Sequence, residues 1–225
     1  MFDRIAHRYD LLNRLLSFGQ DVVWRNKLAG HLKDNPDQKI LDLATGTADV
    51  LLSLQKKGLL IKEGVGIDLS EKMLEIGRRK ITERNLQHVL TLLPGNVSDI
   101  PFPKNSFDVV TIAFGIRNVD NTNKALRDIY RVLKIGGRLI ILEFSLPENR
   151  FIRNCYLFYF RKILPKIGGI ISGDSYAYHY LNETVETFPY GEQFGKLLVS
   201  NGFQNVKRQP LTFGVASVYR GDKIY

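Results

Sequence analysis

Short apolar segments of strand length alternate with amphipathic, helix-like segments along most of this chain. The strand-like segments are KILDLAT, GVGIDL, HVLTLLPGN, FDVVTIAFG and GRLIILEFS. Between them lie VLLSLQKKG, SEKMLEIGRRKITERN and NKALRDIYRVLK, which are typical of helices. This order predicts an α/β fold with a parallel sheet covered on both faces, because strands buried on both sides are almost continuously apolar.

The two ends of the chain depart from this alternation. Near the N-terminus, apolar residues at steps of three and four predict an amphipathic helix, and they are Phe2, Ile5, Tyr9, Leu12 and Leu16. Near the C-terminus, FQNVKRQPLTFGVASVYRGDK is typical of two strands joined near Thr212 to Gly214. This predicts an antiparallel hairpin at one edge of the sheet.

We expect a single domain over residues 1–225, because no linker or shift in composition divides the chain. Within it, residues 1–35 are predicted to form an N-terminal helical cap, and residues 146–190 a lid inserted after the last parallel strand. The lid contains the aromatic and basic segment FIRNCYLFYFRKILPKIGGII. Both segments are expected to cover the strand ends.

Composition limits the classes of protein and ligand. Hydrophobic residues make up 44% of the chain and charged residues 24%, and no apolar run nears the roughly 20 residues that span a bilayer. Without a signal-peptide pattern, we expect a cytoplasmic protein. The single cysteine and the four dispersed histidines predict neither a disulfide nor a metal site. The net charge of +9 favours anionic partners, but the basic residues are spread out, so we expect no nucleic-acid partner.

The segment LDLATGTADV, which follows the first strand, has the pattern of a cofactor-binding turn. A nicotinamide-binding turn carries three glycines, whereas this turn has Gly46 alone, flanked by Ala44 and Ala48. Asp42 precedes the turn, where a carboxylate repels a pyrophosphate but attracts an ammonium group. Asp68, about twenty residues further on, is placed to accept hydrogen bonds from both ribose hydroxyls. These acids suit a nucleoside with a cationic amino-acid tail, which describes S-adenosylmethionine.

Four separated segments resemble those of one enzyme family. They are YDLLNRLLSFGQDVVWR, PFPKNSFDVVTIAFGIRNV, RVLKIGGRLIILEFS and SYAYHYLNETVETFP, and with them the resemblance to the menaquinone/ubiquinone biosynthesis C-methyltransferases covers nearly the whole chain. The resemblance implies a class I S-adenosylmethionine-dependent methyltransferase fold, Rossmann-like, with a seven-stranded and mostly parallel sheet. It also implies methylation of a ring carbon of a polyprenylated quinol, with demethylmenaquinol as the expected acceptor.

The resemblance and the turn chemistry together define a cofactor site at the strand ends. The resemblance implies that S-adenosylmethionine, the methyl donor, is lined by Thr47, Asp68, Asn96 and Val97, the last two near the adenine. Turn chemistry adds Asp42, Ala44 and Gly46. Ala113, at a position where the family commonly has Ser, lies at the same strand ends. The chain departs from the family again at Asp21, where His is usual, and at Ala48, where Gly is usual.

Methyl transfer to a ring carbon is fastest when an adjacent phenolic oxygen is anionic and donates electron density to the ring, so the enzyme must stabilise that oxyanion. Arg117, after the fourth strand, is the best candidate because a guanidinium stays charged, and Asn118 is expected to assist. The alternative for Arg117 is a surface position or a salt bridge to Asp120. Glu143, at the end of the fifth strand, either orients a lid residue or satisfies backbone donors.

A proton must also leave the ring carbon, so a base or a path to water is needed. The predicted candidates are Tyr176 and His179, and further candidates are Tyr180, Tyr9 and Asp10.

The lid segment CYLFYF is predicted to take up the isoprenoid tail and to rest on an anionic membrane surface. Four basic residues lie beside it, namely Arg153, Arg161, Lys162 and Lys166. This places a cytoplasmic protein peripherally at the inner face of the membrane. The alternative is a helix whose aromatic side chains pack on the sheet.

Other functions stay open from sequence alone. They are C-methylation of a ubiquinone-pathway benzoquinol, methylation of another small aromatic or of RNA, and a non-catalytic scaffold in a quinone-biosynthesis assembly. A dehydrogenase is disfavoured because the turn lacks two of three glycines.

Overall fold

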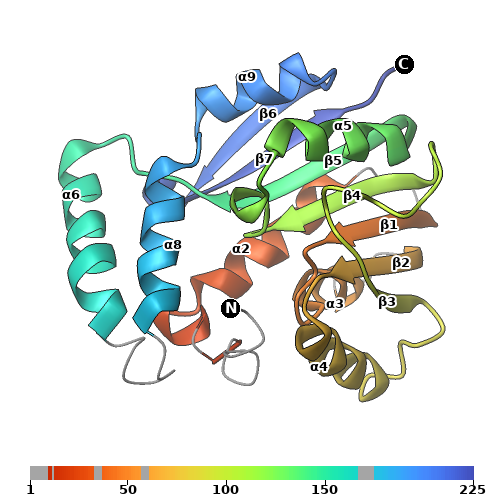
Figure 1. Ribbon diagram of the computed structural model, residues 1–225, viewed down its shortest axis with the longest axis horizontal. Helices are drawn as coiled ribbons and strands as arrows, with labels where there is room; N and C mark the ends of the chain where they lie inside the picture. Colours follow the sequence, from red (N-terminus) through yellow and green to blue (C-terminus); the bar gives the residue numbers. More distant parts are fainter. Residues whose placement is uncertain (1–9, 12, 33–36, 57–60, 167–174) are drawn as a thin grey trace.

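The computed structural model describes residues 10–11, 13–32, 37–56, 61–166 and 175–225, apart from the side chains of residues 175–179. Its centre is a seven-stranded sheet with the order β3-β2-β1-β4-β5-β7-β6 (Figure 1). The strands are β1 (Gln38–Leu43), β2 (Ile61–Asp68), β3 (Leu90–Pro94), β4 (Phe107–Ala113), β5 (Leu133–Phe144), β6 (Gln204–Leu211) and β7 (Ala216–Asp222).

The pairing of the strands confirms the predicted parallel sheet and C-terminal hairpin. Strands β1 to β5 pair in parallel, whereas β7 pairs antiparallel with both β5 and β6. The short turn η4 (Thr212–Gly214) joins the two hairpin strands. The strand order reverses at β1, which pairs with β2 on one side and β4 on the other. Ligands of such sheets bind beside this switch point, beyond the carboxyl ends of the strands.

The helices begin where side chains can cap them. Ser70, Asn121 and Asn149 each accept a hydrogen bond from a backbone N–H of the first helical turn that follows. The helices are α2 (Gln20–Leu28), α3 (Asp49–Lys56), α4 (Glu71–Thr82), α5 (Thr122–Val132), α6 (Arg150–Phe158), α8 (Ser175–Thr187) and α9 (Glu192–Ser200). Shorter turns are η1 (Ala29–His31), η2 (Ile116–Asn118) and the π-helical η3 (Tyr159–Ile163).

Two apolar cores lie on opposite faces of the sheet because successive strand residues point to opposite sides. Leu41 and Leu43 of β1 pack with α5 and α9 on one face. Ile40, which directly precedes Leu41, packs with α2, α3 and α4 on the other face. Burial on both faces explains the continuous apolar runs in the sequence.

Within the predicted lid (residues 146–190), α6 and α8 run side by side beyond the carboxyl ends of the central strands (Figure 1). The lid has its own apolar cluster, whose buried members are Leu146, Phe160, Leu164 and Val185. The Tyr159 hydroxyl donates to the Leu16 carbonyl at 2.9 Å, which ties the lid to the cap (residues 1–35). The other predicted residues of the N-terminal apolar stripe lie outside the described residues, namely Phe2, Ile5, Tyr9 and Leu12.

Candidate active site

The turn after β1 contains three alternate residues in the left-handed conformation. Ala44, Gly46 and Ala48 have φ angles of 49°, 55° and 66°. Glycine adopts this conformation readily, whereas it costs alanine about 1–2 kcal/mol. Gly115 approaches the turn so closely that a Cβ there would lie 2.6 Å from the Cβ of Ala44. A backbone held in this costly conformation indicates a functional turn.

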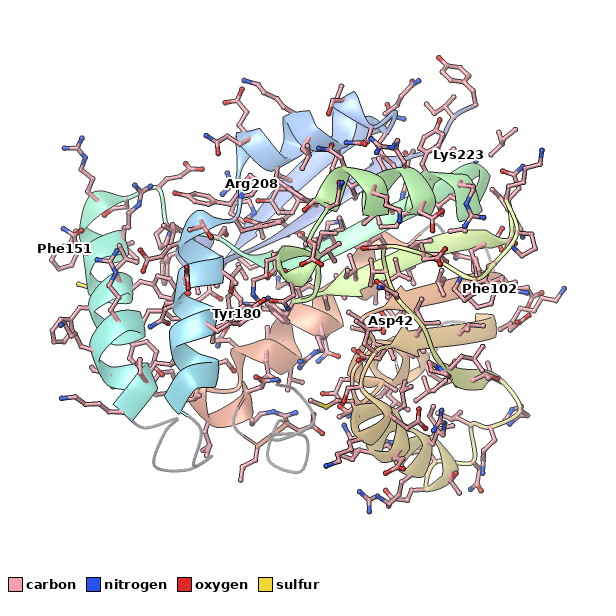
Figure 2. All side chains as sticks on the ribbon, viewed as in Figure 1. Asp42, Phe102, Phe151, Tyr180, Arg208 and Lys223 are labelled. Carbon is pink, nitrogen blue, oxygen red and sulfur yellow. The ribbon has the colours of Figure 1, made fainter. Side chains whose placement is uncertain are left out.

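Asp42 lies at the carboxyl end of β1, behind the turn (Figure 2), and only 1% of it is exposed. The hydroxyls of Thr45 and Thr111 each donate to its carboxylate at 2.6 Å. Burial is the largest influence and raises the pKa of Asp42 to about 6, although both hydroxyls act to lower it. Asp42 is too buried for direct contact, so its effect on a bound cation would be through its charge.

The raised pKa of Asp42 makes stability depend on pH. The folded state holds this proton more tightly than the unfolded state, so the stabilisation is full below pH 3.8 and is lost as the pH rises through about 6. We expect wild type to lose about 3 kcal/mol of unfolding free energy from this group across that window, and Asp42→Asn to lose none of it. Urea unfolding at several pH values measures the difference. The control is Asp108→Asn, which removes a carboxylate paired with Lys134, and parallel pH curves for wild type and Asp42→Asn would contradict the prediction.

Asp68 ends β2, the strand beside β1. Its carboxylate accepts from the backbone N–H of Gly46 at 2.8 Å and from that of Ser70 at 2.9 Å. Asp68 therefore fastens the turn to the start of α4. A carboxylate has about four lone-pair sites, and this one is only half-buried, so it can also accept hydrogen bonds from ligand hydroxyls.

Thr47 is buried in the turn. Hydrogen bonds of Thr47 and ion pairs of Lys80 connect this turn to the cap. Its hydroxyl donates to Asp10 and accepts from Lys80 of α4, each at 2.8 Å. Lys80 also pairs with Asp10 at 2.6 Å and with Asp49 at 2.7 Å. These contacts bring the cap onto the turn, although the residues lie far apart in the sequence.

Asp21, where the resembling family usually has His, forms a buried ion pair in this chain. Its carboxylate lies 2.6 Å from Arg25 and 3.4 Å from Arg14. Arg25 in turn lies 3.6 Å from Asp49, at the start of α3. The carboxylate thus serves a structural role in which it links the cap to the turn through Arg25.

Arg117, in η2 after β4, has a side chain that is only 7% exposed. Its Nη1 donates to Glu143 and to the carbonyl of Phe114, both at 2.6 Å. Glu143 is fully buried and also accepts from the backbone N–H of Phe144 at 2.8 Å, while the guanidinium lies 5.2 Å from the centre of the Phe144 ring. The ion-pair partner is therefore Glu143, not Asp120. Within the described part of the chain, Arg117 Nε has no hydrogen-bond partner.

Three other predicted cofactor residues lie near the ends of β3 and β4. Asn96 is exposed in the loop after β3, and its Oδ1 accepts from the backbone N–H of Ser98 at 2.9 Å. Val97, next to it, is buried in the core. Ala113 is the last residue of β4 and is partly buried.

The predicted residues of the acceptor side come from η2 and α8. Asn118 follows Arg117, and its Oδ1 is buried without a partner among the described residues. The side chain of Tyr180 extends from α8 toward the strand ends (Figure 2). Tyr176 and His179 belong to α8, but their side chains lie outside the described part of the structure, so their roles stay predictions.

Comparison with known proteins places the chain among methyltransferases. The profile of the ubiE/COQ5 methyltransferase family matches residues 1–223. The chain belongs to this family. The relationship that the four sequence segments indicated is thus confirmed, as is S-adenosylmethionine as the methyl donor.

Relatives of this ubiE/COQ5 methyltransferase match along its whole length. The demethylmenaquinone methyltransferase of Thermus thermophilus is 46% identical, and the match covers 99% of this chain and 100% of the relative. The ubiquinone/menaquinone biosynthesis C-methyltransferase UbiE of Geotalea daltonii is 45% identical, with 99% and 94% covered. A SAM-dependent methyltransferase structure from Thermotoga maritima has a TM-score of 0.68 at 21% identity, with 99% and 98% covered, which confirms the predicted fold.

Sequence reasoning missed two buried polar groups of this ubiE/COQ5 methyltransferase. The Tyr156 hydroxyl of α6 and Asn182 Oδ1 of α8 are buried and have no hydrogen-bond partner among the residues described. Both residues lie in helices that mix aromatic and polar side chains, where a polar residue is ordinarily expected to be exposed. That these two polar groups are buried becomes apparent only when the lid helices are packed against η2.

Proposed function

We propose that this chain transfers the methyl group of S-adenosylmethionine to a ring carbon of a polyprenylated quinol, and that demethylmenaquinol is the acceptor. The observation that carries the proposal is the full-length similarity to the demethylmenaquinone methyltransferase of Thermus thermophilus. The buried pair of Arg117 and Glu143 at the strand ends supports the same chemistry, because a quinol ring is most nucleophilic when one of its oxygens is deprotonated and that charge needs a donor.

The residues at the strand ends fit S-adenosylmethionine. Asp68 is proposed to accept hydrogen bonds from the ribose hydroxyls, and the buried carboxylate of Asp42 supplies negative charge behind the turn. Asn96 and Val97 follow β3, the neighbour of β2, where the adenine is proposed to lie. When bound, S-adenosylmethionine supplies an electrophilic methyl group on a sulfonium.

Arg117 is proposed to stabilise the negative charge that a ring oxygen carries once its hydroxyl proton is lost. Glu143 holds Nη1, which fixes the orientation of the guanidinium and leaves Nε–H to bind that oxygen. Because Glu143 offsets part of the positive charge, the site offers an oriented donor rather than a mobile cation. Asn118, beside Arg117, is proposed to bind the ring with its side-chain oxygen.

Tyr176 and His179 are the proposed acceptors of the ring proton, either directly or through water. Asp10, a third candidate from the sequence, is less suited because Lys80 and Thr47 already bind its carboxylate. The base thus comes from α8 in this proposal.

Mass spectrometry of quinones from cells that lack this chain tests the acceptor. Accumulation of a naphthoquinone lighter by one methyl group supports the proposal. A benzoquinone lighter by one methyl group supports the second candidate, a ubiquinone-pathway C-methyltransferase, which the name of the Geotalea daltonii relative favours. Unchanged quinones, with binding of S-adenosylmethionine but no turnover, would instead favour the scaffold alternative.

We further propose that the cap and lid contact a membrane surface. Phe18 of the cap is 78% exposed, Phe151 of the lid points away from the sheet on the outer side of α6 (Figure 2), and Phe213, in the hairpin turn η4, is 79% exposed. The ring of Phe18 lies 5.8 Å from that of Tyr159, so cap and lid share this surface. Phe160 is buried, which shows that part of the aromatic segment packs inward. Among the described helices, none is long and apolar enough to cross a bilayer.

Binding to anionic vesicles should therefore weaken as salt is added. Lys162 and Lys166 are exposed on the lid, and replacing both with alanine should reduce vesicle binding by about 1 kcal/mol for each residue. Sedimentation with phosphatidylglycerol vesicles at rising salt measures this. The control, Lys62→Ala with Lys72→Ala, removes equal charge from exposed positions on β2 and α4. Equal losses in both pairs, or binding that does not respond to salt, would exclude this surface.

A further inference from the structure

Four buried polar atoms around the junction of η2, α6 and α8 have no hydrogen-bond partner within the described ranges. They are Arg117 Nε, Asn118 Oδ1, the Tyr156 hydroxyl and Asn182 Oδ1. Leaving one buried polar atom unpaired is costly, and buried polar groups in proteins are nearly always paired. Four such atoms near one junction indicate a ligand that supplies the missing bonds.

Tyr156 is joined to Arg117 by a row of aromatic rings. Its ring stacks on Phe160 at 5.0 Å, Phe160 lies 6.4 Å from Phe144, and Arg117 lies over the Phe144 ring. The pKa of Tyr156 is raised, chiefly by burial, while the charge of Arg117 acts in the opposite direction. The Tyr156 hydroxyl is therefore neutral and lies within electrostatic range of the guanidinium.

Asn182 faces the same junction from α8 and is only 8% exposed. Val185, three residues later and so on the same side of the helix, belongs to the apolar cluster of Phe160 and Tyr156. Helix α8 also packs against η2, which carries Arg117 and Asn118. Tyr156 and Asn182 of the lid thus lie at the same junction as Arg117 and Asn118 of η2.

We propose that Tyr156 and Asn182 bind the oxygen substituents of the acceptor ring, and that Asn182 acts with Asn118 to select the reduced ring. This inference rests on the proposed quinol substrate. A carboxamide oxygen only accepts hydrogen bonds, and a hydroquinone offers two O–H donors, whereas a quinone offers none. Only the reduced ring can therefore satisfy both Asn118 and Asn182.

Selection of the quinol over the quinone favours productive binding. A site built to hydrogen-bond a hydroxyl rejects a ligand that lacks it, because its own buried groups then stay unpaired. The reduced ring is also the electron-rich form that a methyl cation equivalent can alkylate. Tyr156 both donates and accepts, so it is expected to bind either form and to position the ring without selecting it.

The test compares 2-geranyl-1,4-naphthoquinol as substrate with its oxidised quinone as competitive inhibitor. Asn182→Leu should raise KM for the quinol about three- to tenfold and leave the Ki of the quinone nearly unchanged. The ratio of quinone Ki to quinol KM should therefore fall by the same factor. Tyr156→Phe should raise both constants together. A residue with only a structural role would not change the ratio.

Matched controls keep the outcome interpretable. Asn154→Leu alters an exposed asparagine of α6, and Tyr130→Phe removes a hydroxyl that donates to the Tyr225 carbonyl on α5's side of the sheet. Affinity for S-adenosylhomocysteine and thermal unfolding report the fold, and Asn182→Ala repeats the test if the leucine variant is unstable. If wild type does not methylate the quinol, the proposed function is wrong. If wild type is active and the ratio is the same in the Asn182 variant, the inference alone is overturned.

Discussion

Arg117→Ala should lower turnover on the order of a hundredfold while the affinity for S-adenosylmethionine stays close to wild type. The guanidinium is proposed to stabilise the ring oxygen once its hydroxyl proton is lost, a state that the bound neutral quinol has not reached, so its removal raises the barrier more than it weakens ground-state binding. Arg117→Lys keeps the charge but loses the planar fork that Glu143 orients, so it should be slow yet measurable. Steady-state kinetics with a short-chain naphthoquinol, beside calorimetric binding of the cofactor, gives both quantities.

The fold must be separated from the chemistry in this experiment. Arg117→Ala leaves the fully buried Glu143 without its cation, which costs about 3–5 kcal/mol of stability. Adding Glu143→Gln removes the unpaired charge, so the double variant should regain stability but not turnover. Arg138→Ala breaks a similar pair, formed between the middle of β5 and Asp222 of β7, and should keep full turnover per folded molecule. Loss of cofactor binding with normal turnover at saturation would instead assign Arg117 to the cofactor site.

The fold could be predicted because local patterns and topology agree. Apolar runs in β4 and β5 indicated strands buried on both faces, and an alternation of strands and helices admits few arrangements. The position of the ligand site followed from the same rule, since the carboxyl ends of parallel strands meet at one edge. The hairpin was visible because Thr212 to Gly214 separates two strand-like segments.

The partners of the site residues could not be predicted, because they depend on contacts between distant segments. The sequence suggested Asp120, three residues away, for Arg117, whereas the fold supplies Glu143 from the neighbouring strand. Asp42 was expected to attract an ammonium group, but its burial and its hydrogen bond with Thr111, from β4, became visible only once the strands were paired. Ion pairs such as Asp10 with Lys80 have no local pattern at all.

Asp68→Ala should weaken binding of S-adenosylmethionine by about 3 kcal/mol, or roughly a hundredfold, because two ribose hydroxyls lose a charged acceptor. S-adenosylhomocysteine should lose the same factor, since its ribose is identical and the missing sulfonium charge lies elsewhere. Asp68→Asn keeps one acceptor oxygen and should fall between wild type and alanine. Isothermal calorimetry with both nucleosides measures all three proteins.

The structure adds a second role for Asp68 that this experiment must separate from ribose binding. Its carboxylate also fastens Gly46 and Ser70, so part of the loss in Asp68→Ala comes from a turn that is no longer held. Glu63→Ala, at the other end of β2, removes an acid paired with Lys39 and controls for the loss of charge from the same strand. A turn effect alone would slow turnover at saturating cofactor, whereas lost ribose contacts weaken binding and leave saturated turnover nearly intact. Unchanged affinity for S-adenosylhomocysteine in Asp68→Ala would remove Asp68 from the ribose site altogether.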